Sequence, residues 1–247
     1  MAEETNIEWC DSTFNPWWGC TKIGAGCDNC YAAALDKRTG GDHWAKGTDY
    51  RILSDSNWYK PLRWQKQAAQ FYAQFERRRR VFCASMADVF DNRAQVSQRE
   101  RLWAVVNDTP DLNWLLLTKR PKNIQRFMPE AMLTQDNIWL GTTVENRQDG
   151  LPRLRALKNT PAALRFLSIE PLLEDLGPLD LAGIDWVIVG GESGPGARPM
   201  KKKWMLNIKQ QCDQQGVAFF FKQWGGRQNK GGCEVEGETY KRWPLSA

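Results

Sequence analysis

Three cysteines near the start of the chain, Cys20, Cys27 and Cys30, are the residues whose type and spacing most clearly suggest chemistry. Gly24 and Gly26 lie between the first two thiols, so the loop has the freedom to turn all three sulfurs toward one point. Sulfur ligands of this kind favour an iron–sulfur cluster or zinc over hard cations. Because the set has three members rather than four, one metal position would stay open to another ligand.

The spacing alone leaves three interpretations open. A [4Fe–4S] cluster would use three thiolates and keep one iron free. A structural zinc site would need a fourth ligand, which Cys10, Cys83 or Asp88 could supply. The third interpretation is that the cysteines are incidental. A disulfide framework is disfavoured, because the chain has an odd count of 7 cysteines.

The remaining composition narrows the chemistry further. His43 is the only histidine, which excludes histidine triads and His-rich zinc sites and leaves acid–base work to Asp, Glu, Lys, Tyr or Cys. A net charge of +5 accompanies three basic runs, namely Arg77–Arg80, Lys119–Lys122 and Arg198–Lys203. Such runs either contact phosphate backbones or close solvated helix ends. The first run is expected to close a helix.

The length of 247 residues suits one large domain, and we expect a single barrel domain over residues 1–247. An inserted loop region around 39–60 and a short C-terminal tail from about 227 would be appended to it. No apolar segment is long enough to span a bilayer, and the first residues lack the features of a signal peptide. We therefore expect a cytoplasmic protein, in the host cytoplasm if it is phage-encoded. The sequence leaves the oligomeric state open.

From residue 80 onward, short apolar runs alternate with helical segments, a pattern typical of βαβ units and a parallel sheet. The expected fold class is α/β, a closed or partial parallel β/α barrel, with a doubly wound open sheet as the alternative. The expected strands are 8–14, 81–85, 114–118, 138–142, 164–169, 186–189 and 217–221. The expected helices are 96–107, 121–132, 148–158 and 203–215.

Polar residues follow the carboxyl ends of these strands, where barrels of this class place their sites. We expect the insertion to cover this rim and the cysteine loop to lie on it. The candidate site residues at these strand ends are Ser85, Asp88, Lys119, Thr143, Glu145, Ser168, Glu170, Gly190, Gly191, Glu192 and Lys222.

The cysteines lie within two motifs, Phe14-Asn15-Pro16-Trp17-Trp18-Gly19-Cys20 and Gly26-Cys27-Asp28-Asn29-Cys30-Tyr31-Ala32. These motifs resemble the signature of the three-Cys-motif family of phage and bacterial proteins, a divergent branch of the radical S-adenosylmethionine (SAM) superfamily. The segments 85–90, 117–121, 139–146, 166–172, 187–194 and 220–225 are similar as well, so the resemblance runs from about residue 7 to 226.

The resemblance implies a radical SAM enzyme of barrel fold. Cys20, Cys27 and Cys30 would hold a [4Fe–4S] cluster, and an external donor would reduce it. Reductive cleavage of SAM would then give methionine and a 5′-deoxyadenosyl radical. Two departures mark the chain as divergent: the cysteine intervals are six and two residues rather than three and two, and Asn29 replaces the usual aromatic residue.

Within this scheme, Glu192, Lys222 and Asp88 are the expected catalytic or substrate-orienting residues. Phage members of the resembled family are linked to hypermodified DNA bases, so the implied substrate is an amino-acid-substituted thymine in DNA or a modified nucleotide, with isomerisation as the implied reaction. The alternatives are a zinc-stabilised nucleic-acid-binding protein and an iron–sulfur redox protein that does not use SAM. The expected SAM-binding residues are Ser85, Lys119, Thr143, Glu145, Ser168, Glu170, Gly190 and Gly191.

Overall fold

One sheet of seven parallel strands forms the centre of the protein in a computed structural model that describes residues 5–227 and 231–244. Each strand pairs with the next along the sheet in parallel register, and among the described residues β1 and β9 are the first and last strands of this sheet. The order has no reversal, so the expected partial parallel barrel is confirmed and the doubly wound alternative is wrong. The strands in sheet order are β1 (Ser12–Phe14), β4 (Arg79–Cys83), β5 (Leu112–Thr118), β6 (Ile138–Thr143), β7 (Leu164–Ile169), β8 (Trp186–Gly190) and β9 (Ala218–Gln223).

The two faces of the sheet bury different side chains, because alternate residues of a strand point to opposite sides. In β4, Val81 and Cys83 pack with the helices of the larger core, whereas Phe82 packs with a second cluster on the inner face. That inner cluster is rich in aromatic rings, among them Trp9 and Trp186. Both faces are therefore covered, which explains the nearly continuous apolar strands.

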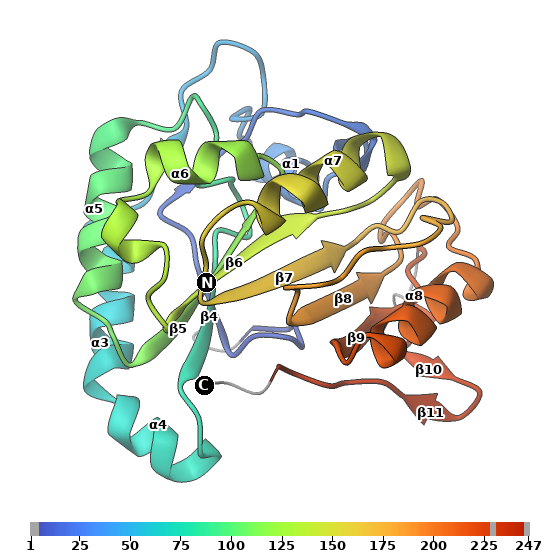
Figure 1. The fold of residues 1–247 in the computed structure, drawn as a ribbon. Coiled ribbons are helices and arrows are strands. Elements are labelled where there is room, and N and C mark those ends of the chain that lie inside the picture. The colour runs from blue at the N-terminus through green and yellow to red at the C-terminus, as the bar shows by residue number, and fades with distance from the viewer. Residues whose placement is uncertain (1–4, 228–230, 245–247) are drawn as a thin grey trace.

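Helices follow the strands and cover the outer face of the sheet (Figure 1). The predicted helix 96–107 is confirmed as one element, but the predicted helix 121–132 is broken into three pieces. Met128 is extended, as a residue before a proline tends to be, and Pro129 separates α6 from the third piece. These elements are α1 (Tyr31–Arg38), α5 (Val96–Asn107), η2 (Pro121–Asn123), α6 (Ile124–Phe127), η3 (Glu130–Met132), α7 (Arg147–Lys158) and α8 (Lys202–Gln214).

The segment between α1 and β4 contains more structure than the predicted helix and insertion. Its helix α4 ends at Phe75, and Arg79 already begins β4, so the prediction that Arg77–Arg80 closes a helix is wrong. Arg77 pairs with Asp11 at 2.6 Å near the amino ends of the strands, and Arg78 pairs with the exposed Asp136 at 3.0 Å. Its elements are β3 (Arg51–Ile52), α2 (Asp55–Trp58), α3 (Lys60–Lys66) and α4 (Ala68–Phe75). Strand β3 pairs antiparallel with β2 (Trp17–Trp18), which precedes α1 in the chain.

The C-terminal segment returns to the sheet after a small hairpin of β10 (Glu234–Val235) and β11 (Glu238–Thr239). Phe221 N donates to Tyr240 O at 2.7 Å, and Arg242 N donates to Phe219 O at 3.0 Å. The segment therefore lies against the free edge of β9, although positions 228–230 and 245–247 of the predicted tail lie outside the described residues.

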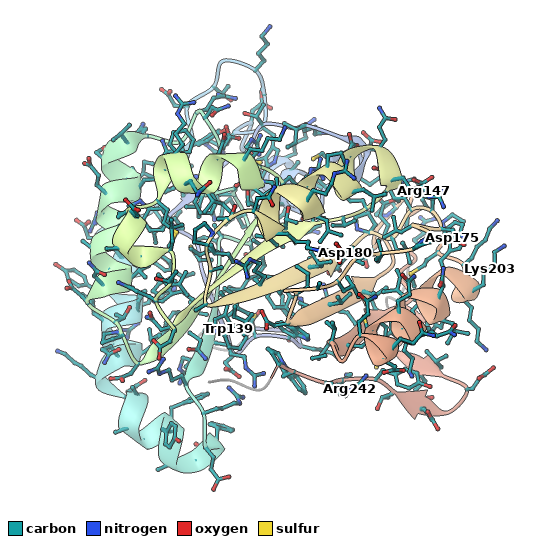
Figure 2. The ribbon with its side chains drawn as sticks, viewed as in Figure 1. Trp139, Arg147, Asp175, Asp180, Lys203 and Arg242 are labelled. Atoms are coloured by element: carbon teal, nitrogen blue, oxygen red, sulfur yellow. The ribbon has the colours of Figure 1, made fainter. Side chains whose placement is uncertain are left out.

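The periphery of the molecule carries the exposed charges. Figure 2 shows Arg147, Lys203 and Arg242 at the outside, whereas Trp139 lies within the sheet region. No helix in the described part of the chain has both the length and the apolar character that crossing a membrane requires.

Candidate active site

A cavity of about 400 Å³ opens at the carboxyl ends of the strands. Its lining draws on the cysteine loop, defined here as Cys20–Cys30, and on the ends of β4 to β9. Apolar side chains of Trp9, Phe82 and Leu117 lie on the side of the inner aromatic cluster. The cavity therefore has an apolar interior and a polar rim, an arrangement common in ligand sites.

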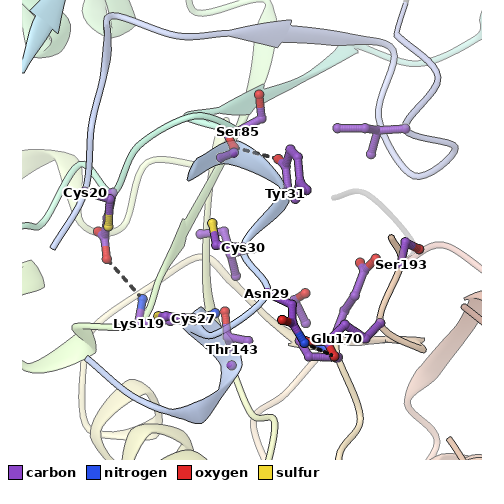
Figure 3. A pocket seen from close by; sticks show the side chains of 18 of the residues that line it. Cys20, Cys27, Asn29, Cys30, Tyr31, Ser85, Lys119, Thr143, Glu170 and Ser193 are labelled. Carbon is purple, nitrogen blue, oxygen red and sulfur yellow. Dashed lines mark hydrogen bonds between the residues drawn. The ribbon is translucent and has the colours of Figure 1, made fainter. Parts of the chain in front are cut away.

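All three cysteines of the loop line this cavity (Figure 3). Gly19 precedes them with a φ of 129°, a conformation that favours glycine, and the short helix η1 (Ala25–Cys27) brings Cys27 inward. The Cys20 thiol donates to Thr21 O at 3.6 Å. Burial raises the pKa of this thiol, against the opposing effect of the neighbouring Arg120.

The sulfurs share one cavity but are not gathered into a ligand set. Within 5–227 and 231–244, no group of three His, Cys, Asp or Glu side chains lies close enough together to hold a metal ion. The suggested fourth zinc ligands are dispersed. Cys83 packs in the outer core, Cys10 packs in the inner aromatic cluster, and Asp88 lines the cavity with its carboxylate bound to Arg120.

The cysteine loop rests on the end of β6 and the start of α7. A Cβ atom at Gly26 would collide with the Glu145 carboxylate, and one at Gly24 would lie 2.8 Å from Asp149 Oδ2. Glu145 is fully buried and pairs with Arg153 at 2.5 Å and with Lys119 at 3.3 Å. Gly26 is thus required for the close approach of the loop, whereas a side chain at Gly24 would displace the end of the Asp149 side chain.

The opposite wall carries a lysine and a carboxylate in contact. Lys222 Nζ lies 2.6 Å from Glu170 Oε1, and both side chains are mostly buried. Gln223 Nε2 donates to the same oxygen at 3.3 Å and to Ser193 Oγ at 2.7 Å. Figure 3 shows Glu170 and Ser193 across the cavity from Cys20. This wall offers both donors and acceptors to a bound molecule.

Hydroxyl groups at three predicted positions also line the cavity, namely Ser85, Thr143 and Ser168. Ser85 is fixed on both sides, since its carbonyl accepts from Tyr31 Oη at 2.6 Å and its hydroxyl accepts from Asn15 Nδ2 at 3.0 Å. The two others are almost fully buried at the ends of β6 and β7.

Asp88 and Glu192, two of the predicted catalytic residues, already bind protein groups. Asp88 accepts from Arg120 Nη1 and Thr118 Oγ1, both at 2.8 Å. Glu192 accepts from Arg198 and from Asn29 Nδ2. Burial would raise the pKa of Glu192, but these hydrogen bonds lower it below its ordinary value. Glu192 is therefore a carboxylate with little remaining capacity for a ligand.

The structure places most of the other predicted residues on the cavity. Lys119, Glu170, Gly191 and Lys222 line it, whereas Glu145 and Gly190 lie behind its surface. Gly191 permits a close contact, since a Cβ there would collide with the carbonyl of Trp224.

Several lining residues escaped the sequence prediction. Trp44 reaches the cavity from the predicted insertion, and the exposed ring of Tyr31 lies at its edge. For Trp9 and Phe82 the sequence indicated only packing, because the sequence pattern of a buried aromatic residue is the same whether the ring faces a cavity or a core. The position of Tyr31, directly after Cys30, was a usable signal.

The fold resembles that of solved structures described as spore photoproduct lyase. A cysteine-to-alanine mutant of that protein has a TM-score of 0.52 at 9% identity, and the likeness covers 92% of this chain and 79% of the other. A tyrosine-to-phenylalanine mutant gives 0.47 at 11% identity over 87% of this chain and 64% of the other. The first likeness establishes the fold alone.

No curated protein matches this chain. A family model described as a protein of unknown function (DUF5131) matches residues 4–244. The protein therefore belongs to the DUF5131 family.

Proposed function

We propose that this protein is a radical SAM enzyme. The observation that carries the proposal is that Cys20, Cys27 and Cys30 line one cavity with the carboxyl ends of β4 to β9 in a parallel sheet. A fold similar to that of spore photoproduct lyase supports it, and so does the resemblance of the cysteine motifs to a branch of the radical SAM superfamily.

The donor chemistry of the site fits a [4Fe–4S] cluster held by Cys20, Cys27 and Cys30. The three thiols belong to one loop, and Gly24 and Gly26 let that loop pack closely against Asp149 and Glu145. When bound, such a cluster would supply the electron, taken from an external donor, for reductive cleavage of SAM to methionine and a 5′-deoxyadenosyl radical. The apolar floor and the nearly buried strand ends would exclude water from that radical.

The remaining lining residues would bind and orient SAM and the substrate. Thr143, Ser168 and Ser85 present hydroxyl groups suited to ribose or amino groups. Lys119 lies on the same side of the cavity as the cysteines and suits the carboxylate of SAM, although it also forms an ion pair with Glu145. The pair of Glu170 and Lys222 would bind polar groups at the opposite wall. Gly191 would contribute only backbone atoms to the site, because the Trp224 carbonyl fills the space where its Cβ would be.

The finer proposal is that the enzyme isomerises an amino-acid-substituted thymine in phage DNA. The family resemblance prompts it, and the charge of the rim is compatible with it. Lys22 and Lys119 line the cavity, and Lys201 and Lys202 are exposed at the start of α8. The run Arg77–Arg80 does not contribute, because it lies at the amino end of β4, opposite to the carboxyl ends that line the cavity. A cytoplasmic location and a single domain over 1–247 remain part of the proposal.

The decisive experiment is anaerobic reconstitution with iron and sulfide, followed by reduction with dithionite in the presence of SAM. We expect a brown protein, with about four irons per chain as a [4Fe–4S] cluster requires, that releases 5′-deoxyadenosine. A triple Cys-to-Ser variant at positions 20, 27 and 30 should lose both properties, whereas Cys212→Ser in α8 should keep them. A colourless protein with stoichiometric zinc would overturn the proposal in favour of a zinc-stabilised binding protein.

The DNA proposal has a separate test. Turnover should be higher on duplex DNA carrying the substituted thymine than on the corresponding free nucleotide. Equal turnover on the free nucleotide would reject DNA as the substrate while leaving SAM cleavage intact.

A further inference from the structure

We infer that two ion-pair clamps hold the cysteine loop in place before any cofactor binds, and that Arg120, Glu192 and Arg198 are positioning residues for it. The first clamp consists of Arg120, Asp88 and Asp91, and the second of Glu192 and Arg198. The inference deepens the proposed function, because it rests on the cysteine loop being the cluster-binding segment.

The first clamp binds the start of the loop. Arg120 lies 2.8 Å from Asp88 and 3.0 Å from Asp91, and all three side chains are at most 8% exposed. Arg120 Nη2 donates to Thr21 O at 2.5 Å, while Thr21 N donates to Asp91 Oδ2 at 2.7 Å. Both backbone groups of Thr21, the residue after Cys20, are therefore bound by the clamp.

The first clamp is itself anchored to the sheet. Thr118 Oγ1, at the end of β5, donates to Asp88 at 2.8 Å, and Lys119 N donates to it at 3.2 Å. The position of Thr21 is thus tied to the ends of β4 and β5. Arg120 Nη1 also lies 3.8 Å from Cys20 Sγ, the one contact of this clamp with a cysteine sulfur in the described structure.

The second clamp binds the end of the loop. Glu192 accepts from Arg198 N and Nε at 2.9 Å and from Arg198 Nη2 at 2.6 Å. Arg198 Nη2 donates onward to Ala25 O at 2.9 Å, and its Nη1 lies 3.2 Å from Asp28. The bidentate geometry available to arginine suits this double role.

Asn29 completes the second clamp from the side of the loop. Its Nδ2 donates to Glu192 Oε2 and to Gly196 O, both at 3.0 Å. This residue stands where the resembled superfamily usually has an aromatic residue, so the departure has a physical role here. It attaches the segment between Cys27 and Cys30 to the turn that follows β8.

These contacts involve backbone atoms and the side chains of Asp28 and Asn29, and apart from Arg120 they leave the thiols free. A loop held in this way does not need a metal to define its path, unlike small zinc modules, which fold only with metal. Glu192 thereby acts on the proposed chemistry through the loop and not by touching SAM. Removal of a clamp should increase local opening of the loop without unfolding the sheet.

Limited trypsin digestion of the metal-free protein tests this directly, because exposed Lys22 places a cleavage site inside the loop. Mass spectrometry would give the rate of cleavage after Lys22. The wild type should resist cleavage, and Arg198→Gln should raise the rate about tenfold. The protein should stay folded, because Asn29 and the backbone N–H of residue 198 still donate to Glu192. Arg198→Lys, which keeps the charge, should fall between them. Arg242→Gln, which removes an outer ion pair with Asp213, is the control and should match the wild type.

The same variants give a second readout in the iron retained after reconstitution, which should fall in Arg198→Gln and stay at the wild-type level in Arg242→Gln. Arg120→Gln carries a risk of misfolding, since it leaves two buried carboxylates, so Arg198→Gln decides the outcome. Rapid cleavage after Lys22 in the wild type, or equal rates in all variants, would overturn the inference. If the protein binds zinc or fails to cleave SAM, the proposed function fails while the trypsin comparison still stands.

Discussion

The ion pairs around the cavity differ in how much hydrogen-bonding capacity they keep for a ligand. All four charged residues line the cavity, but Asp88 and Glu192 are surrounded by protein donors, whereas Lys222 contacts Glu170 as its ion-pair partner. A lysine ammonium has three N–H donors, so Lys222 can bind a further acceptor beside Glu170. The same residue types therefore serve two purposes, and only the contacts distinguish positioning carboxylates from ligand-facing ones.

Lys222→Met tests the ligand-facing pair. The change keeps the length of the side chain but leaves Glu170 without its cation, so SAM binding should weaken about tenfold, equivalent to roughly 1.4 kcal/mol. Equilibrium dialysis of the reconstituted protein would measure it, with iron content expected to stay unchanged.

The matched control for this variant is Lys158→Met, which removes an ion pair with Asp180 on the outside of α7. SAM affinity within twofold of the wild type in Lys222→Met would contradict a role of the pair in binding SAM.

At the scale of elements, the regular βα repeats were mostly predictable, whereas the helices between 55 and 75 were not. The segments 96–107 and 164–169 were predicted with the observed bounds, because each is a periodic or apolar run between turns. The helices between 55 and 75 are short and carry their buried tryptophans at irregular spacing, so no single period identifies them.

The candidate site was predictable to a similar extent. The cysteine loop and most polar strand ends were identified because a parallel barrel gathers the carboxyl ends of its strands. The clamps were not predictable, since Arg120 and Arg198 each meet loop residues about a hundred or more positions earlier in the chain. Pairing over such distances depends on tertiary structure, and no local pattern reports it.

The C-terminal segment, which the sequence left as an uninformative tail, acts as a cover for the β9 edge. Its Trp243 ring lies 5.0 Å from the ring of Phe220, and the Arg80 guanidinium stacks 5.0 Å above it. Covering an edge strand also protects its backbone groups from pairing with another chain.

Trp243→Ala should therefore lower the free energy of unfolding by about 2 kcal/mol, less than a fully buried tryptophan because this one is partly exposed. Urea unfolding followed by circular dichroism would measure the loss. Trp243→Phe keeps a ring against Phe220 and should cost about half as much or less. An unchanged urea midpoint in the alanine variant would show that the segment does not contribute to the stability of the sheet.

Across the whole molecule, the inner face of the sheet is divided between a solid aromatic cluster and the cavity. Trp186 is fully buried at the centre of this cluster, with the rings of Trp9, Trp139, Phe166 and Phe220 within 6.2 Å. Trp9 also lines the cavity, so the cluster forms the floor on which a ligand would rest. The position of a bound ligand should therefore depend on Trp186, although Trp186 does not itself line the cavity.

Trp186→Ala separates this role from stability when it is compared with Trp114→Ala. Both tryptophans are fully buried in the same sheet, Trp186 in β8 and Trp114 in β5, but Trp114 packs on the helix-covered face beside Phe14. Both variants should lose about 3–5 kcal/mol of stability, measured by urea unfolding. Only Trp186→Ala should also weaken SAM binding, because Trp9, which lines the cavity, loses the ring that it packs against. Added indole should restore part of the stability and part of the SAM affinity by filling the void. Equal SAM affinity in the two variants would show that the floor is rigid without Trp186.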